Sequence, residues 1–200
     1  MAEKIILFDL GKVILNFDLT IISGKLSALS NNSESDIAYY IFENGLSRAF
    51  ERGNLTPEEF FEAVRRQLNL TITLEQFKPI WNEIFTPMPG MEALVNALKA
   101  THRVGLLSNT NKLHFEYVAN TYPVVQGMDW HLSYKMHTAK PDPEIYNKVI
   151  QFYNINPKEI FFTDDIARNV EGAINAGMQA VQFHSVGQLK EELAHRGIPA

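Results

Sequence analysis

Hydrophobic and polar positions follow two patterns along the chain, and the first of them predicts strands. Residues 5–8 form a short, fully apolar run that ends at Asp9, which is typical of a strand buried on both faces of a parallel sheet. Amphipathic segments with apolar residues three or four positions apart separate this run from later ones, as expected for helices. The later runs lie at 104–107, 130–134, 160–163 and 180–183. This alternation predicts an α/β fold, a doubly wound, Rossmann-like parallel sheet with helices on both faces.

A long helical stretch interrupts the alternation after the first strand. Between about residues 19 and 86, apolar side chains recur at helical spacing, and capping motifs begin at Ser33, Thr56 and Thr73. The prolines and the glycine within residues 86–90 cannot continue a helix and therefore end the pattern. The stretch is long enough for an inserted module of four short helices.

These patterns divide the chain into two predicted domains. Residues 1–15 and 88–200 are expected to form the Rossmann-like core, and residues 16–87 are expected to form a helical cap. Residues 12–18 are expected to leave the first strand through a turn and a small hairpin.

Composition and charge narrow the class of protein. The 200 residues are 46% apolar and 20% charged, which is ordinary for a globular chain of one domain with an insert. The formal net charge is −5 and no cluster of lysine and arginine stands out, so we expect no nucleic-acid partner. The chain has no cysteine, which excludes disulfides, zinc–thiolate sites and cysteine nucleophiles. Because neither a signal peptide nor a membrane-spanning run is apparent, we expect no membrane partner and a cytoplasmic location.

Polar side chains stand at or just beyond the ends of several predicted strands. Because the carboxyl ends of parallel strands lie at one edge of a sheet, Asp9 and Asp164 are expected to face each other across a crevice. Two carboxylates that face each other about 4 to 5 Å apart repel each other, so we expect a cation to bind between them. A set of ligands made only of oxygen atoms suits Mg²⁺. Mg²⁺ with a lysine and a hydroxyl can hold a phosphate, which Asp9 could attack as a nucleophile. The polar side chains are Asp9, Ser108, Asn109, Lys140, Asp164 and Asp165.

Four segments carry these side chains, and in this order they resemble the motifs of the haloacid dehalogenase superfamily of hydrolases. The resemblance extends over the whole chain, and a stretch at residues 51–60 is similar to that of members with a helical cap. The four segments are Phe8-Asp9-Leu10-Gly11-Lys12-Val13, Leu107-Ser108-Asn109-Thr110, Lys140-Pro141-Asp142-Pro143-Glu144-Ile145-Tyr146, and Phe162-Thr163-Asp164-Asp165 followed by Asn169-Val170-Glu171-Gly172-Ala173.

The resemblance implies a mechanism that passes through an aspartyl phosphate. Asp9 would be the nucleophile. The side chains of Asp9 and Asp164, with the carbonyl of Gly11, would hold Mg²⁺. Asp165 would assist in binding the metal, through water.

The resemblance also implies how the substrate is held. Ser108 and Asn109 would bind the phosphoryl oxygens, and Lys140 would offset the charge on the phosphate and on the nucleophile. The cap would close over the site and select a small phosphorylated metabolite. Arg48, Glu51 and Arg52 are hypothetical contributors to that selection, because they lie in the cap stretch that resembles the family.

One position departs from the family pattern. Phosphatases of this family typically carry a second aspartate two residues after the nucleophile, as a general acid and later as a base, and here that position is Gly11, followed by Lys12. A leaving group that needs little protonation would tolerate this loss, so a sugar 1-phosphate is the favoured substrate class. The Asp-Leu-Gly motif also resembles that of the family's bacterial glucose-1-phosphate phosphatases.

Two alternatives remain open at this point. A 2-haloacid dehalogenase also lacks the second acid, because halide leaves without a proton, but Asp164 and Asp165 favour a metal and hence phosphate. A regulator that binds phosphate without catalysis is the other alternative, which the presence of Asp9, Lys140 and Asp164 disfavours.

Overall fold

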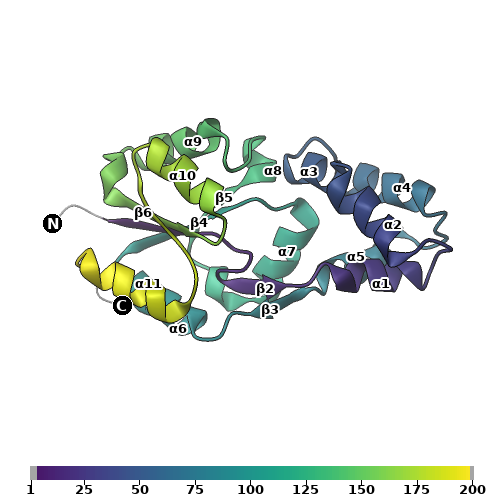
Figure 1. Cartoon of the computed structure of the whole chain (residues 1–200), viewed down its shortest axis with the longest axis horizontal. Coiled ribbons are helices and arrows are strands. Elements are labelled where there is room, and N and C mark those ends of the chain that lie inside the picture. Colours follow the sequence, from purple (N-terminus) through teal and green to yellow (C-terminus); the bar gives the residue numbers. More distant parts are fainter. Residues whose placement is uncertain (1–3, 199–200) are drawn as a thin grey trace.

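A parallel sheet forms the centre of the computed structural model, which describes residues 4–198 (Figure 1). Across that range the sheet has five strands in the order β5-β4-β1-β6-β7, each parallel to its neighbours. Because β1 is central and pairs with β6, the loops that follow these two strands lie side by side. The predicted doubly wound sheet is confirmed. The strands are β1 (Ile5–Phe8), β4 (Arg103–Ser108), β5 (Asp129–Leu132), β6 (Ile160–Asp164) and β7 (Gln179–Gln182).

Helices cover both faces of the sheet because successive residues of β1 point to opposite sides. Ile6 and Phe8 belong to the hydrophobic cluster that includes residues of α6, α7 and α11. Ile5 and Leu7 belong to a second cluster with residues of α9 and α10. Figure 1 shows these two groups of helices on either side of the sheet. The helices of the core are α6 (Met91–Lys99), α7 (Lys112–Thr121), α8 (Ser133–Met136), α9 (Pro143–Tyr153), α10 (Ala167–Asn175) and α11 (Val186–His195), with short 3₁₀ turns η2 (Pro123–Val125) and η3 (Pro157–Glu159).

The cap contains five α-helices within the described chain, one more than predicted, and a π-helical turn. Gly45, in the left-handed conformation with φ of 87°, separates the π-helical turn from the next helix. That helix is short, and no side chain caps its N-terminus. The capping motif at Thr56 is confirmed, because its hydroxyl accepts from Glu59 N at 3.1 Å while the Glu59 carboxylate accepts from Thr56 N at 2.8 Å. The elements are α1 (Thr20–Ser27), α2 (Glu34–Ala38), η1 (Tyr39–Glu43), α3 (Leu46–Glu51), α4 (Pro57–Gln67) and α5 (Leu74–Asn82).

Two short antiparallel strands join the cap to the core. β2 (Leu15–Phe17) pairs with β3 (Phe85–Pro87), so the two points at which the chain crosses between core and cap run side by side. The expected local hairpin over residues 12–18 is therefore wrong. The strand partner lies about seventy residues further along, where no local pattern points to it. The predicted domain boundaries at residues 15/16 and 87/88 fall at one end of this two-stranded ribbon.

Helix α7 takes part in both regions. Its residue Leu113 belongs to the hydrophobic cluster of the cap, together with Trp81 of α5, whereas Phe115 belongs to the core. In Figure 1, α7 lies between the sheet and the cap helices. A polar edge of the sheet and the inner side of the cap thus meet near the start of α7. Within residues 4–198, no helix is both long enough and apolar enough to cross a bilayer.

Candidate active site

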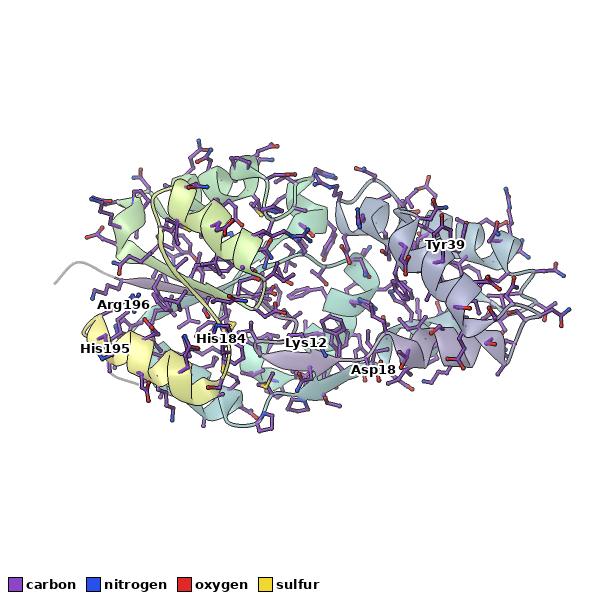
Figure 2. All side chains as sticks on the ribbon, viewed as in Figure 1. Lys12, Asp18, Tyr39, His184, His195 and Arg196 are labelled. Carbon is purple, nitrogen blue, oxygen red and sulfur yellow. The ribbon has the colours of Figure 1, made fainter. Side chains whose placement is uncertain are left out.

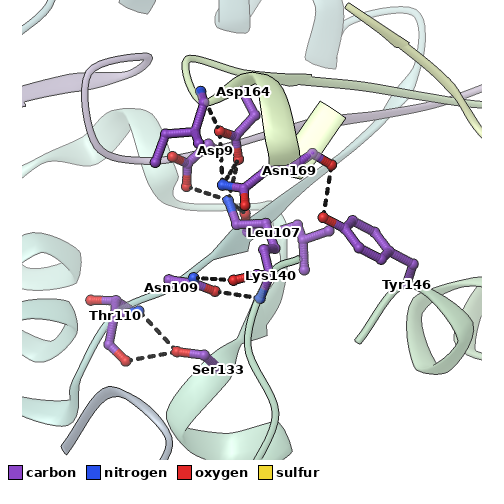
Figure 3. Close-up of polar contacts among 10 residues, drawn as sticks. Asp9, Leu107, Asn109, Thr110, Ser133, Lys140, Tyr146, Asp164 and Asn169 are labelled. Carbon is purple, nitrogen blue, oxygen red and sulfur yellow. Dashed lines mark hydrogen bonds and ion pairs between the residues drawn. The ribbon is translucent and has the colours of Figure 1, made fainter. Parts of the chain in front are cut away.

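A buried lysine joins two of the predicted aspartates. Asp9 follows the central strand β1, and Asp164 ends the neighbouring strand β6. Lys140 Nζ lies 2.8 Å from Asp9 Oδ1 and 2.6 Å from Asp164 Oδ2, and it donates to the carbonyl of Leu107 at 2.8 Å (Figure 3). The Lys140 and Asp164 side chains are almost wholly removed from solvent, and that of Asp9 is 11% exposed. The sheet therefore brings together three residues that are far apart in the sequence.

A second set of contacts fixes the orientation of Asp164. Asn169 Nδ2 lies 3.0 and 3.1 Å from its two carboxylate oxygens, and the backbone N–H of Ile166 donates to Oδ1 at 2.8 Å. Tyr146 in turn donates its hydroxyl to the carbonyl of Asn169 at 2.7 Å (Figure 3). Asn169 and Tyr146 lie in two of the motif segments, but the sequence alone did not predict a role for either residue. Their structural role is to hold the carboxylate of Asp164 in place.

The charges in this cluster shift one another's pKa values. Burial raises the pKa of Asp9 to about 7, with the charge of Asp164 adding to the rise and that of Lys140 opposing it. Burial alone would lower the pKa of Lys140, but the charges of Asp9 and Asp164 outweigh it and the pKa is raised. Burial, assisted by the charge of Asp164, also raises the pKa of Asp165. A single lysine thus only partly compensates three neighbouring carboxylates.

The three aspartates are close enough to share a cation. Asp9, Asp164 and Asp165 each offer a carboxylate oxygen, and these oxygens lie within 4.8 Å of one another. An all-carboxylate donor set with excess negative charge fits a hard divalent cation such as Mg²⁺. Gly11, the fourth predicted ligand, lies in the loop after Asp9 and lines the adjoining cavity. The predicted metal-binding role of its carbonyl stays a prediction.

Asn109 holds the backbone of Lys140. Its Nδ2 donates to the Lys140 carbonyl at 2.9 Å, and its Oδ1 accepts from the Lys140 N–H at 2.8 Å (Figure 3). This reciprocal pair positions the lysine, a role that the sequence did not predict. Ser108 is buried at the end of β4, and both residues line a cavity that Leu10 and Gly11, directly after Asp9, also line. Their predicted role in binding phosphoryl oxygens stays a prediction.

A cavity of about 270 Å³ opens between these loops and the cap. The cap contributes an aromatic wall and, from α3, Arg48 and Glu51. Arg52, the third hypothetical specificity residue, instead pairs with Asp142 of the core at 2.7 Å and is not among the lining residues. The lining residues are Leu10, Gly11, Phe17, Leu19, Phe42, Ser47, Arg48, Glu51, Trp81, Ile84, Phe85, Ser108, Asn109, Thr110 and His114.

Two of the lining residues face each other across the loop after β1. Phe17 of β2 packs over Gly11 so closely that a Cβ atom on this glycine would lie 2.6 Å from Phe17 Cε1. Lys12 adopts a positive φ of 59°, donates to the Phe17 carbonyl at 2.6 Å and places its ammonium 4.8 Å from the centre of the ring (Figure 2). The aromatic ring thus occupies the space into which a side chain at position 11 would extend.

Glu51 is the acidic residue of the cavity wall. Burial raises the pKa of Glu51 to about 7, the charge of Asp9 raises it further, and Arg48 opposes the rise.

The fold and this site define a hydrolase with an inserted cap. A family model described as haloacid dehalogenase-like hydrolase matches residues 3–177. The chain therefore belongs to the haloacid dehalogenase-like hydrolases, as the motif resemblance predicts.

Relatives and solved structures support the same family. A D-ribitol-5-phosphate phosphatase of Bacteroides thetaiotaomicron is 25% identical over 95% of this chain and 96% of its own length. A crystal structure of a haloacid dehalogenase family enzyme from the same organism superposes with a TM-score of 0.85 at 27% identity, covering 96% of this chain and 99% of that one. A complex of that enzyme with magnesium and inorganic phosphate superposes with a TM-score of 0.81 at 28% identity, covering 92% and 96%.

Proposed function

We propose that this protein is a Mg²⁺-dependent phosphatase of a small phosphorylated metabolite, with a sugar 1-phosphate as the favoured substrate class. The observation that carries the proposal is the cluster of Asp9, Asp164 and Asp165 around the buried ammonium of Lys140. A similar fold in complex with magnesium and phosphate, and a relative that acts on D-ribitol 5-phosphate, support it.

The reaction begins at the carboxylate of Asp9. One of its oxygens attacks the phosphorus, the bond to the leaving oxygen breaks, and an aspartyl phosphate forms. Lys140 offsets the charge shared by the carboxylate and the phosphoryl group, while Ser108 and Asn109 bind the phosphoryl oxygens. Water then attacks the phosphorus and releases phosphate and free Asp9.

The donor set beside Asp9 would hold the metal. Asp9, Asp164 and Asp165, with the carbonyl of Gly11, would be its ligands. When bound, Mg²⁺ supplies positive charge next to the phosphoryl oxygens and so stabilises the transition state.

The preference for a sugar 1-phosphate rests on the loop after β1. Gly11 offers no acid in this loop, and an anomeric oxygen, which leaves more easily than an ordinary alkoxide, needs less help from an acid placed elsewhere in the site. The cavity of about 270 Å³ lies just below the range of about 300–1,000 Å³ for ligand pockets, which favours a monosaccharide over a nucleotide. Polyol 5-phosphates are the natural comparison, because a relative acts on one.

The test is phosphate release from a panel of sugar 1-phosphates, sugar and polyol 5-phosphates and nucleotides, with Mg²⁺ and with a chelator. We expect release that needs Mg²⁺, is fastest for sugar 1-phosphates and is lost in Asp9→Asn, whose folding is verified by circular dichroism. Release that survives complete metal removal would contradict the metal site. Chloride release from 2-chloropropionate, with no phosphate release from any ester, would instead identify a dehalogenase. Phosphate binding without any turnover would instead identify a regulator that binds phosphate without catalysis.

A further inference from the structure

We infer that Glu51 of the cap is the general acid–base residue of the reaction and replaces the acid that position 11 lacks. This inference rests on the proposed phosphatase function and adds the group that moves the protons. It comes from the shape of the site and from the side chains that line the cavity.

Position 11 supplies no acid, and the packing of Phe17 opposes a side chain there. A Cβ atom there would lie 2.6 Å from Cε1 of Phe17 and 3.2 Å from Cδ1, far inside van der Waals contact. Phe17 is held in the β2–β3 ribbon, where its ring packs edge-on to Phe85 with centroids 6.4 Å apart. The group that handles protons must therefore come from another element.

The titratable residues that line the cavity, among those the structure describes, are Arg48, Glu51 and His114. The guanidinium of Arg48 remains protonated and cannot act as a base. Both ring nitrogens of His114 have partners, at 3.1 Å from Asn111 Nδ2 and at 3.0 Å from the Trp81 carbonyl. Burial also lowers the pKa of His114 to about 4, so its imidazole stays neutral. Glu51 is the remaining group that can both accept and donate a proton.

Three successive residues anchor this end of α3 to the core and so fix the backbone of Glu51, a residue that lines the cavity together with Gly11, Ser108 and Asn109. The hydroxyl of Ser133 lies 2.6 Å from the Glu51 carbonyl, to which it donates, and accepts from the N–H of Thr110 at 2.9 Å. Thr110 directly follows the predicted phosphate-binding pair, so one hydroxyl links Glu51 to that loop (Figure 3 shows the half formed by Ser133 and Thr110).

The next two residues complete the anchor. Arg52 pairs with Asp142 at 2.7 Å, and Gly53 packs so tightly that a Cβ atom would lie 2.2 Å from the Tyr134 carbonyl. The end of α3 is therefore held against the core at three consecutive positions, and a side chain there keeps its place relative to the loop after β4.

The surroundings of Glu51 suit proton transfer near neutral pH. The charged groups that act on it are Asp9, which follows β1, and Arg48 on its own helix. Burial and the charge of Asp9 raise the pKa of Glu51 to about 7, against the opposing effect of Arg48. A general acid–base group works best when its pKa lies near the operating pH.

The protons balance over one turnover. As Asp9 attacks the phosphorus, the P–O bond to the sugar breaks, and the leaving oxygen takes the proton of the Glu51 carboxyl. In the second half, water attacks the phosphorus and gives a proton to the Glu51 carboxylate. The P–O bond to Asp9 then breaks, and its electron pair returns to the carboxylate. Glu51 ends the cycle protonated, as it began.

The experiment compares Glu51→Gln with Glu58→Gln, an exposed carboxylate on α4 that serves as the matched control. Two substrates are used with Mg²⁺: the best sugar phosphate from the panel, and p-nitrophenyl phosphate, whose leaving group needs no proton. We expect Glu51→Gln to lower kcat on the sugar phosphate by about 10²- to 10⁴-fold, the usual contribution of general acid–base catalysis. On p-nitrophenyl phosphate it should release a burst of about one p-nitrophenol per active site, because the aspartyl phosphate then hydrolyses slowly. Formate should restore part of the turnover in Glu51→Ala.

The outcomes separate the inference from the proposed function. If the wild-type protein releases no phosphate from any ester, the proposed function fails. If the wild type is active and Glu51→Gln matches Glu58→Gln on both substrates, Glu51 has no role in proton transfer. If Glu51→Gln is slow without a burst, and formate does not rescue Glu51→Ala, the residue only binds or positions the substrate, which also overturns the inference.

Discussion

The ammonium group of Lys140 lies 2.6 Å from a carboxylate oxygen of Asp164, and both side chains are almost fully removed from solvent. The same ammonium also contacts Asp9, so one buried cation is shared by two carboxylates at the ends of neighbouring strands and compensates them in part. Such a contact is expensive to break, because loss of one partner leaves the others charged and without compensation. The predicted catalytic lysine is therefore a structural element of the core as well.

Replacement of this lysine should therefore reduce stability as well as activity. We expect Lys140→Ala to lower the free energy of unfolding by about 3–5 kcal/mol, because Asp9 and Asp164 would then be buried in a low-dielectric site without a compensating positive charge. Lys112→Ala is the matched control, because Lys112 forms an exposed i,i+4 pair with Glu116 and such pairs contribute about 0.5 kcal/mol. Urea denaturation of both variants measures the difference. Equal midpoints for the two variants would contradict a stabilising role of the buried pair.

A buried histidine should make stability depend on pH. Burial lowers the pKa of His114 from 6.5 to about 4, so between these values the unfolded chain binds more protons than the folded one. The stability that His114 contributes is therefore fully present above pH 6.5 and is lost as the pH drops towards 4, by about 3 kcal/mol. His131, whose pKa burial also lowers to about 4, acts in the same direction.

Unfolding by urea at several pH values tests this dependence. Asp9 and Glu51, whose pKa values are raised to about 7, contribute the opposite slope, so the test is the difference between variants. Between pH 4 and pH 6.5 the slope of unfolding free energy against pH should be lower in His114→Gln than in the wild type by about 1.4 kcal/mol per pH unit, the contribution of one proton. His184→Gln is the control, since His184 is exposed. A slope in His114→Gln that matches the wild type would show that this histidine is not held neutral in the fold.

The cavity predicts a binding role for Arg48. Its side chain lines the cavity on the cap side, across from Ser108 and Asn109. A hydrogen bond from a charged group contributes about 1.5–3 kcal/mol, so Arg48→Ala should raise KM by about 10- to 100-fold and change kcat much less. Arg66→Ala, on the outer side of α4, is the control. An unchanged KM for the best substrate would remove Arg48 from the binding site.

Local sequence patterns were sufficient to predict the strands of the core and the edge of the sheet at which the candidate site residues lie. The apolar run before Asp9 and the strand before Asp164 were predictable because a buried parallel strand has a continuous apolar signature, and the order of the strands then placed both carboxylates at one edge. Contacts between distant segments left no such signature. The pairing of β2 with β3 and the pair of Arg52 with Asp142 depend on how the cap folds back onto the core, which no short window of sequence encodes.

The packing of Phe17 over Gly11 is another contact that no short stretch of sequence predicts. Gly11→Asp should destabilise the protein by about 1–3 kcal/mol, because its Cβ would lie 2.6 Å from the Phe17 ring in a packed region. Removal of the ring should relieve the clash, so Gly11→Asp in a Phe17→Ala background should cost no stability beyond that of Phe17→Ala alone. Thermal denaturation of the two single variants and the double variant measures both effects.

The double variant should also change the chemistry. It would carry an acid two residues after Asp9, which can protonate an alkoxide leaving group, so its activity on ordinary alkyl phosphates should exceed that of Phe17→Ala by about tenfold or more. If Glu51 is the native proton carrier, the same pair of substitutions should restore turnover to Glu51→Gln. A Gly11→Asp single variant with wild-type stability would contradict the prediction, because it would show that the Phe17 ring moves aside freely and that packing does not exclude an acid from this position.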